Sequence, residues 1–127
     1  MSNAPGRCGE WREPLRWLLL SLVPWFGLVF TWFLGAFSGG LDVQETCELL
    51  EGQTYDSAYR DDNWQEPSRL FPLHNKCNAS YDLVPSWINP TIVGLAVATA
   101  GCLITAVVMA AAHFKSQRQL RPGPEHP

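Results

Sequence analysis

The stretch TIVGLAVATAGCLITAVVMAAA, residues 91–112, decides the architecture of this chain. Its 22 residues include no Asp, Glu, Lys or Arg. About 20 apolar residues in a helix are enough to cross the hydrocarbon core of a bilayer. A second run without formal charge extends from Trp17 to Leu41. In the helices of a soluble domain, charged residues interrupt the apolar sequence at regular intervals. The two uninterrupted runs therefore predict two transmembrane helices.

The predicted fold class is an all-α membrane protein, a hairpin of two transmembrane helices joined by an extracytoplasmic loop of about 45 residues. The predicted segments are a tail 1–16, a span 17–39, a loop 40–87, a span 88–113 and a disordered tail 114–127. The alternative for the first span is a cleaved signal peptide with Ala36-Phe37-Ser38 as its processing site. The apolar run exceeds the roughly 7–15 residues of such peptides, which favours the span.

The distribution of charge predicts the orientation of the spans. Residues 42–82 carry nine of the 12 acidic residues and only three of the nine basic ones. The other six Lys and Arg lie in the two tails, close to the ends of the apolar runs. Basic residues near the ends of spans are retained in the cytoplasm. We therefore expect a multi-pass protein of the plasma membrane with both termini cytoplasmic and the acidic loop outside.

One short element is predicted within the loop. Asp42 and Glu45 have the spacing of a capping box, which predicts a helix over 43–51 with Gly52 just past its end. The rest of the loop alternates aromatic and turn-forming residues without a clear period. Three prolines argue against a long element there: Pro67, Pro72 and Pro85.

Two cysteines predict a disulfide that closes the loop. Cys47 and Cys77 are the only cysteines in it, and the expected topology places both in an oxidising compartment. Because a region of this size forms little core by itself, a covalent link is expected to matter. The chain-entropy model gives roughly 3–4 kcal/mol for a closed loop of about 31 residues.

Two further positions are candidates for modification. Asn78-Ala79-Ser80 is a glycosylation sequon in the predicted extracytoplasmic loop, relevant only in a host that has the machinery. Cys8, beside the first span, is a candidate for reversible lipidation, with an idle reduced thiol as the favoured alternative.

Small residues recur at helical spacing in both spans and predict helix interfaces, since they allow backbones to approach closely. In the first span the four small residues are Gly27, Thr31, Gly35 and Gly39. The second span repeats alternating steps of three and four, which is typical of a left-handed crossing. Its residues are Thr91, Gly94, Ala98, Gly101, Thr105, Val108 and Ala112. The pattern leaves open whether the two faces meet within one chain or between chains.

The sequence offers no defensible catalytic or metal site. Neither span has an ionisable residue at depth, as a proton relay or transporter site requires. In the loop, His74, Cys77, Asp56 and Asp61 match no known spacing of metal ligands. No phosphate-binding loop or basic patch is present. We expect no enzyme activity, no cofactor, no metal, no nucleic-acid partner and no small-molecule substrate.

The segment NWQEPSRLFPLHNKCNASYDLVPSW, residues 63–87, resembles small uncharacterised two-pass membrane proteins of high-GC Gram-positive bacteria. The resemblance covers about a fifth of the chain. Seven Arg against two Lys agree with such an origin. The resemblance implies a plasma-membrane location and an incidental sequon. It implies no activity and no functional residue.

The expected function is that of a structural or interaction subunit, whose partners are the bilayer and either another membrane protein or a second copy. One alternative is a self-assembling channel or transporter subunit lined by the threonines of the second span. Another is a sensor whose loop binds a cation or a cationic ligand. Four loop aromatics are candidate contacts, with a small core under the disulfide as the favoured alternative: Tyr55, Tyr59, Trp64 and Phe71.

Overall fold

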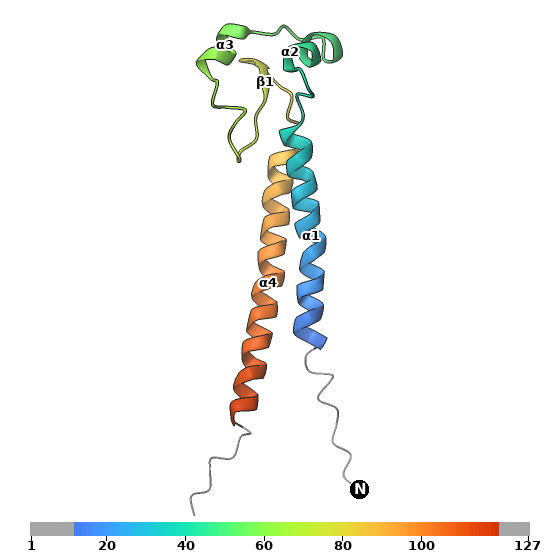
Figure 1. Cartoon of the computed structure of the whole chain (residues 1–127), viewed down its shortest axis with the longest axis vertical. Coiled ribbons are helices and arrows are strands. Elements are labelled where there is room, and N and C mark those ends of the chain that lie inside the picture. Colours follow the sequence, from blue (N-terminus) through green and yellow to red (C-terminus); the bar gives the residue numbers. More distant parts are fainter. Residues whose placement is uncertain (1–11, 120–127) are drawn as a thin grey trace, which may run out of the picture. The chain divides into compact units, whose positions relative to one another are not determined.

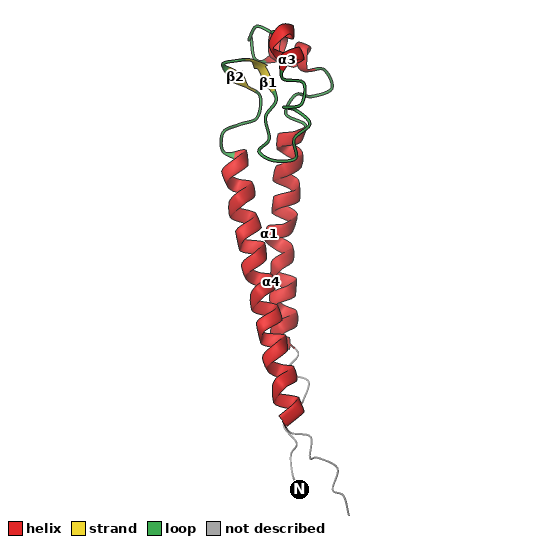
Figure 2. Ribbon diagram, turned by 90° about the vertical axis from the view of Figure 1, so that its left-hand side faces the viewer, coloured by secondary structure: helices red, strands yellow, loops and turns green. Residues whose placement is uncertain are grey.

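The computed structural model describes residues 12–119 and is mostly helical (Figures 1 and 2). Two long helices, α1 Arg12–Ala36 and α4 Ile88–Gln119, are long and apolar enough to span a membrane, which confirms that part of the predicted fold class. The chain divides into two compact units, whose described parts are 12–25 with 96–119 and 26–95. The predicted tails over 1–11 and 120–127, with Cys8, lie outside the described residues.

Helix α1 differs from its predicted bounds at both ends. It begins at Arg12, before the predicted start at Trp17, because arginine, glutamate and leucine are good helix formers and Pro14 lies within the first turn, where proline is tolerated. It ends at Ala36, before the predicted end at Gly39. A turn follows, in which Gly40 has φ +63°, a conformation that glycine adopts without strain.

Helix α4 corrects one prediction of disorder. Residues 114–119, predicted to belong to a disordered tail, continue the helix to Gln119. The sequence there, FKSQRQ, contains mostly good helix formers. Arg118 lies in the last turn, where a cation interacts favourably with the helix dipole.

In the first unit, α1 and α4 lie side by side. Pro14 and Ser21 of α1 and Ala106 of α4 are buried there. Residues of both helices line a shallow apolar hollow of about 220 Å3: Pro14, Leu15, Leu18, Ala106, Val107 and Ala110. Contact in this unit is therefore between small or apolar side chains.

The second unit contains the ends of both long helices and the residues between them. Its short elements are α2 Val43–Glu45, a π-helical turn η1 Thr46–Leu50, α3 Ser57–Asp62 and the antiparallel strands β1 Lys76–Asn78 and β2 Tyr81–Asp82. Together α2 and η1 form the short helix that was predicted, one residue shorter. Asp42 caps it through bonds from the backbone N–H groups of Gln44 and Glu45, and Gly52 follows with φ +62°.

Helix α3 and the β1–β2 hairpin were missed in a segment expected to be irregular. Asp56 caps α3 by accepting the N–H of Tyr59 at 3.0 Å. At the hairpin turn, Asn78 Oδ1 accepts the backbone N–H groups of Ser80 and Tyr81. Side-chain caps therefore define these elements, and they are too short to show a hydrophobic period.

The core of the second unit lies where the loop meets the two helices. Leu73, Val84, Ile88 and Ile92 are buried together, and Trp32 packs against them. A Cβ on Gly35 would lie 2.6 Å from Leu73 Cδ1 and 2.8 Å from Ile88 Cγ2. Glycine at position 35 is thus required by the close approach of the loop and of α4 to α1.

Side-chain hydrogen bonds from two residues hold the returning loop to the helices. Trp32 Nε1 of α1 donates to Leu70 O at 2.9 Å. Asn89, in the first turn of α4, accepts the N–H of Leu73 at 2.9 Å and donates to its C=O at 3.0 Å. Asn89 thereby satisfies both backbone groups of Leu73, as a neighbouring strand would.

We predict that Gly35→Ala destabilises the second unit by about 1–3 kcal/mol, because the added methyl group overlaps Leu73 and Ile88. The matched control is Gly94→Ala in α4, where no described residue outside the adjacent turns of the helix lies within 4 Å of an added Cβ. Equilibrium unfolding in mild detergent measures both. Equal effects of the two substitutions would contradict the packing at Gly35.

Candidate functional site

The residues 40–87, called the head from here on, are closed by the predicted disulfide. Cys47 in η1 and Cys77 in β1 are bonded, with their Cα atoms 5.8 Å apart and both side chains fully buried. Backbone bonds surround the disulfide: Gln53 N–H donates to Cys47 O at 2.8 Å, and Asp56 N–H donates to Cys77 O at 2.9 Å. The disulfide therefore joins short elements that are held mainly by polar contacts, and the predicted pairing is confirmed.

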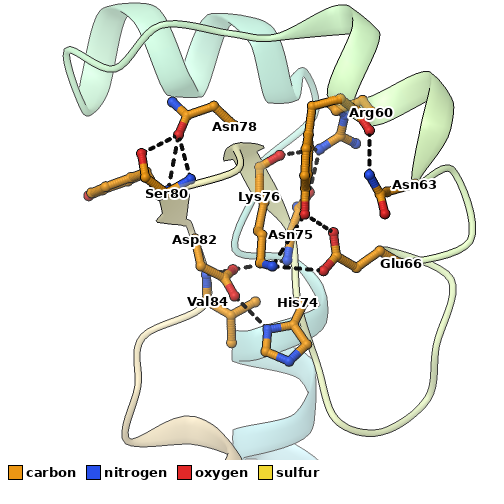
Figure 3. A network of polar contacts seen from close by, with 12 residues as sticks. Arg60, Asn63, Glu66, His74, Asn75, Lys76, Asn78, Ser80, Asp82 and Val84 are labelled. Atoms are coloured by element: carbon orange, nitrogen blue, oxygen red, sulfur yellow. Dashed lines mark hydrogen bonds and ion pairs between the residues drawn. The ribbon is translucent and has the colours of Figure 1, made fainter.

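Asp82 organises the return of the chain from β2 to α4. Its Oδ1 accepts the backbone N–H groups of Asn75 and Val84 at 3.0 and 2.9 Å, and its Oδ2 lies 2.6 Å from His74 Nδ1 (Figure 3). His74 is half-buried in this contact. One carboxylate thus binds groups on both sides of the hairpin, which fixes the backbone that leads to the core.

A second cluster joins β1 to the residues after α3. Lys76 Nζ lies 3.1 Å from Glu66 Oε1 and donates to Tyr59 Oη at 3.2 Å (Figure 3). Tyr59 in turn donates to Glu66 Oε2 at 3.2 Å. The hydrogen bond to Glu66 first, and then that to Tyr59, raise the pKa of Lys76 above its ordinary value of 10.5.

Arg60 of α3 contacts the same side of the head. Its Nη1 donates to Asn75 Oδ1 at 3.0 Å and to Lys76 O at 2.9 Å. The guanidinium lies 5.8 Å from the centre of the Tyr55 ring. Two of the three basic residues of the loop are therefore engaged within the head.

A hollow of about 230 Å3 lies beside these two clusters. Its wall includes Tyr55, Tyr59, Arg60, Asp61, Trp64, Glu66 and Lys76. Both signs of charge line it, and the cations already have acceptors within the head. Within residues 12–119 no group of three or more His, Cys, Asp or Glu could hold a metal ion.

The four candidate contact aromatics divide into two pairs. Tyr55 and Tyr59 are half-buried, with Arg60 over the first ring and Lys76 over the second. Trp64 and Phe71 are 68% and 49% exposed. The second pair is therefore the more exposed of the two.

Asn78, the sequon residue, is engaged in the fold. Its Nδ2 donates to Thr54 O at 2.9 Å, while its Oδ1 accepts from Ser80 Oγ at 2.8 Å (Figure 3). The atom that a glycan would modify thus faces a backbone carbonyl. Its structural role is to close the β1–β2 turn against the preceding segment.

The predicted interface residues of α1 lie on the face that contacts the rest of the second unit. Thr31, Gly35 and Gly39 are buried. A Cβ on Gly27 would lie 3.5 Å from Leu95 of α4. A Cβ on Gly39 would lie 2.8 Å from Val43 Cγ2. The face therefore contacts α4 and the start of the head.

The predicted interface residues of α4 lie elsewhere. Gly94, Ala98 and Gly101 are exposed, and Thr105, which is half-buried, bonds back to Gly101 O. The more buried residues of α4 also follow steps of three and four, one residue later: Ile88, Ile92, Leu95, Thr99, Cys102 and Ala106. A shift of one residue turns the face by about 100°. Large side chains such as Ile88 and Leu95 fill the space beside the α1 glycines.

Sequence reasoning missed Trp32, Asp82 and Asn89 as organising residues. Asp82 directly precedes the uncharged run that contains residues 91–112, and Asn89 lies near its start. A buried polar group in such a position must find a partner. A polar residue in an apolar run could therefore have marked Asn89 as important. Nothing in the sequence indicates that its partner is Leu73.

Comparison with protein-family models, with curated proteins and with solved structures finds no match to this chain. The resemblance of residues 63–87 to two-pass membrane proteins therefore stays a prediction.

We predict that replacing Cys47 and Cys77 by serine lowers the free energy of unfolding of the head by roughly 3–4 kcal/mol, because the unfolded chain regains the entropy of a closed loop. Limited proteolysis between residues 52 and 70 measures the effect. The control is Cys102→Ala, which removes a thiol outside the head. Two alkylatable thiols in the unreduced head would contradict the bridge.

We predict that Lys76→Met destabilises the head by about 0.5–1 kcal/mol at neutral pH. Because the pKa of Lys76 is raised in the folded state, its contribution is fully present below pH 10.5 and is lost as the pH rises through the folded value. Denaturant unfolding at several pH values checks this. Arg69→Met, which removes an exposed cation from the same loop, is the control. A difference between wild type and Lys76→Met that persists at the highest pH would contradict the ion pair.

Proposed function

We propose that this chain is an integral protein of the plasma membrane that crosses the bilayer twice. The observation that carries the proposal is the exposure of the two long helices. Only 17% of the most apolar window of α1 and 11% of that of α4 are buried within the chain. A soluble domain rarely exposes apolar surface on this scale. Contact with lipid removes this surface from water and so avoids the free-energy cost of hydrating it.

The disulfide and the charge distribution support the proposed orientation. A disulfide persists in an oxidising compartment, which favours an extracytoplasmic head. Six basic residues lie in the two tails, before the first apolar run and after the last one. They favour a cytoplasmic location for both termini. A reporter active only outside the cytoplasm, fused after residue 127, should be inactive. Activity there would overturn the orientation.

The proposed role is that of an accessory or structural subunit, which acts through helix packing and through the head. Two features support it. On the small-residue face of α4, apart from the adjacent turns of that helix, no residue within 12–119 lies within 4 Å of a Cβ added at Gly94 or Gly101. Ala98, between them, is exposed. The head exposes apolar side chains far along the chain from that face, including Leu49 and Leu50 at 73% and 77%.

The alternatives have less support. Two of the three threonines that could line a pore donate to the carbonyl four residues earlier in the chain, Thr91 Oγ1 to Trp87 O and Thr105 Oγ1 to Gly101 O. Their hydroxyls are thereby occupied. A cation sensor would use the acidic loop, but Glu66, Asp82 and Glu51 already accept from Lys76, His74 or Tyr81.

We predict a defined complex when the tagged chain is purified at its native level in mild detergent, measured by native mass. Ala98→Leu should release the partner, because the larger side chain keeps the helices apart. Val97→Leu, on a neighbouring exposed face, is the matched control and should retain it. A foreign membrane protein at fixed stoichiometry supports the accessory role. A homo-oligomer alone would replace it with self-assembly, and a monomer under all conditions would contradict both.

A further inference from the structure

The segment Leu70–Leu73 is held at both ends by the long helices. Leu70 O accepts a hydrogen bond from Trp32 Nε1 of α1, and both backbone groups of Leu73 are bonded to Asn89 of α4. In Figures 1 and 2 the connection between α3 and β1 descends from the head to the level of the adjoining helix ends. Its position along the helices is therefore fixed by bonds to residues inside them.

Trp32 lies inside the uncharged part of α1. A hydrocarbon core of about 30 Å takes about 20 helical residues, which counted from Trp17 reach Ala36. Trp32 lies four residues before Ala36, about 6 Å deeper at the rise of an α-helix. If α1 spans a bilayer, the carbonyl that it binds lies at the outer edge of the hydrocarbon.

The side chains of the segment suit that position. Leu70 is 74% exposed and Phe71, next to it, is half exposed. No charge lies between Arg69 and His74. Phe37 and Trp87 are also exposed where α1 ends and α4 begins, which extends the apolar surface around the segment. Aromatic residues are enriched at this level of a membrane, and an arginine beside it suits a lipid phosphate.

Three of the seven polar backbone groups of the segment are hydrogen-bonded. Leu70 O and both groups of Leu73 have bonds, and Pro72 has no N–H. Irregular backbone is tolerated at membrane depth only when its polar groups find partners. The carbonyl groups of Phe71 and Pro72 are not among the bonded groups, so the segment suits the hydrated interface of a bilayer and not its hydrocarbon core.

We propose that Leu70, Phe71 and Pro72 insert into the outer interface of the bilayer and are held there by Trp32, as a third, non-spanning contact of the chain with lipid. The inference rests on the proposed membrane insertion. The contact fixes the head against the membrane surface, so that α3 and the exposed Trp64 keep a constant height above it.

The test uses nitroxide labels on the full chain with Cys8→Ser and Cys102→Ala, the disulfide intact, in vesicles of zwitterionic and anionic phospholipid. Single cysteines are placed at 70 and, separately, at 71. Position 49 in the head is the aqueous control, and position 97, exposed on α4, is the lipid control. Accessibility to oxygen is compared with accessibility to a water-soluble nickel complex.

The expected result is an oxygen-to-nickel accessibility ratio at 70 and 71 several-fold above that at 49 and nearer to that at 97. Adding Trp32→Phe should lower the ratio at 71, because the bond to Leu70 O is lost. Ratios at 70 and 71 equal to that at 49, with a lipid-like value at 97, would overturn the inference and leave the membrane proposal standing. An aqueous value at 97 would overturn the membrane proposal itself.

Discussion

The second unit depends on the close approach of the loop to α1 at Gly35. Leu73 and Ile88 occupy the volume that any side chain at position 35 would need. This contact brings the end of the loop, the start of α4 and the end of α1 together around one small core with Val84 and Ile92. Dispersion attraction is strong only at short separation. Because glycine has no side chain, the three segments approach closely enough to pack against one another. The bonds from Trp32 and Asn89 then set the register of the returning chain.

The head is held together mainly by covalent and polar contacts. Its fully buried residues include both cysteines, and charged side chains such as Lys76 and Arg60 are bonded to other side chains or to the backbone. About 45 residues form little apolar core alone, so the disulfide and carboxylates such as Asp82 define the chain path. This arrangement leaves Trp64, Leu49 and Leu50 exposed. The apolar surface of the head is therefore available to a partner.

The two long helices divide their faces between internal and external contacts. The glycine-containing face of α1 contacts the chain itself, whereas the glycines at 94 and 101 of α4 are exposed. Lipid follows the surface of a single helix closely, but a groove of small residues offers most to a second helix. The exposed small-residue face of α4 thus supports the proposal of an accessory subunit, and the lack of ionisable side chains within the apolar runs disfavours a carrier.

The sequence by itself determined the two long apolar helices, the cap at Asp42 and the pairing of Cys47 with Cys77. The helices follow from local composition, the cap follows from two hydrogen bonds to one side chain, and the pairing follows from there being only two cysteines in the loop. Helix α3 and the hairpin have local side-chain caps but are too short to show a hydrophobic period. The contacts of Trp32, Asp82 and Asn89 were decided only by the tertiary structure. The tertiary structure also decided which face of α4 is buried. The 3.5-residue period was evident in the sequence, but the contacting face was not. A period is a property of one helix, whereas a contacting face depends on which side chains fill the surface of its neighbour.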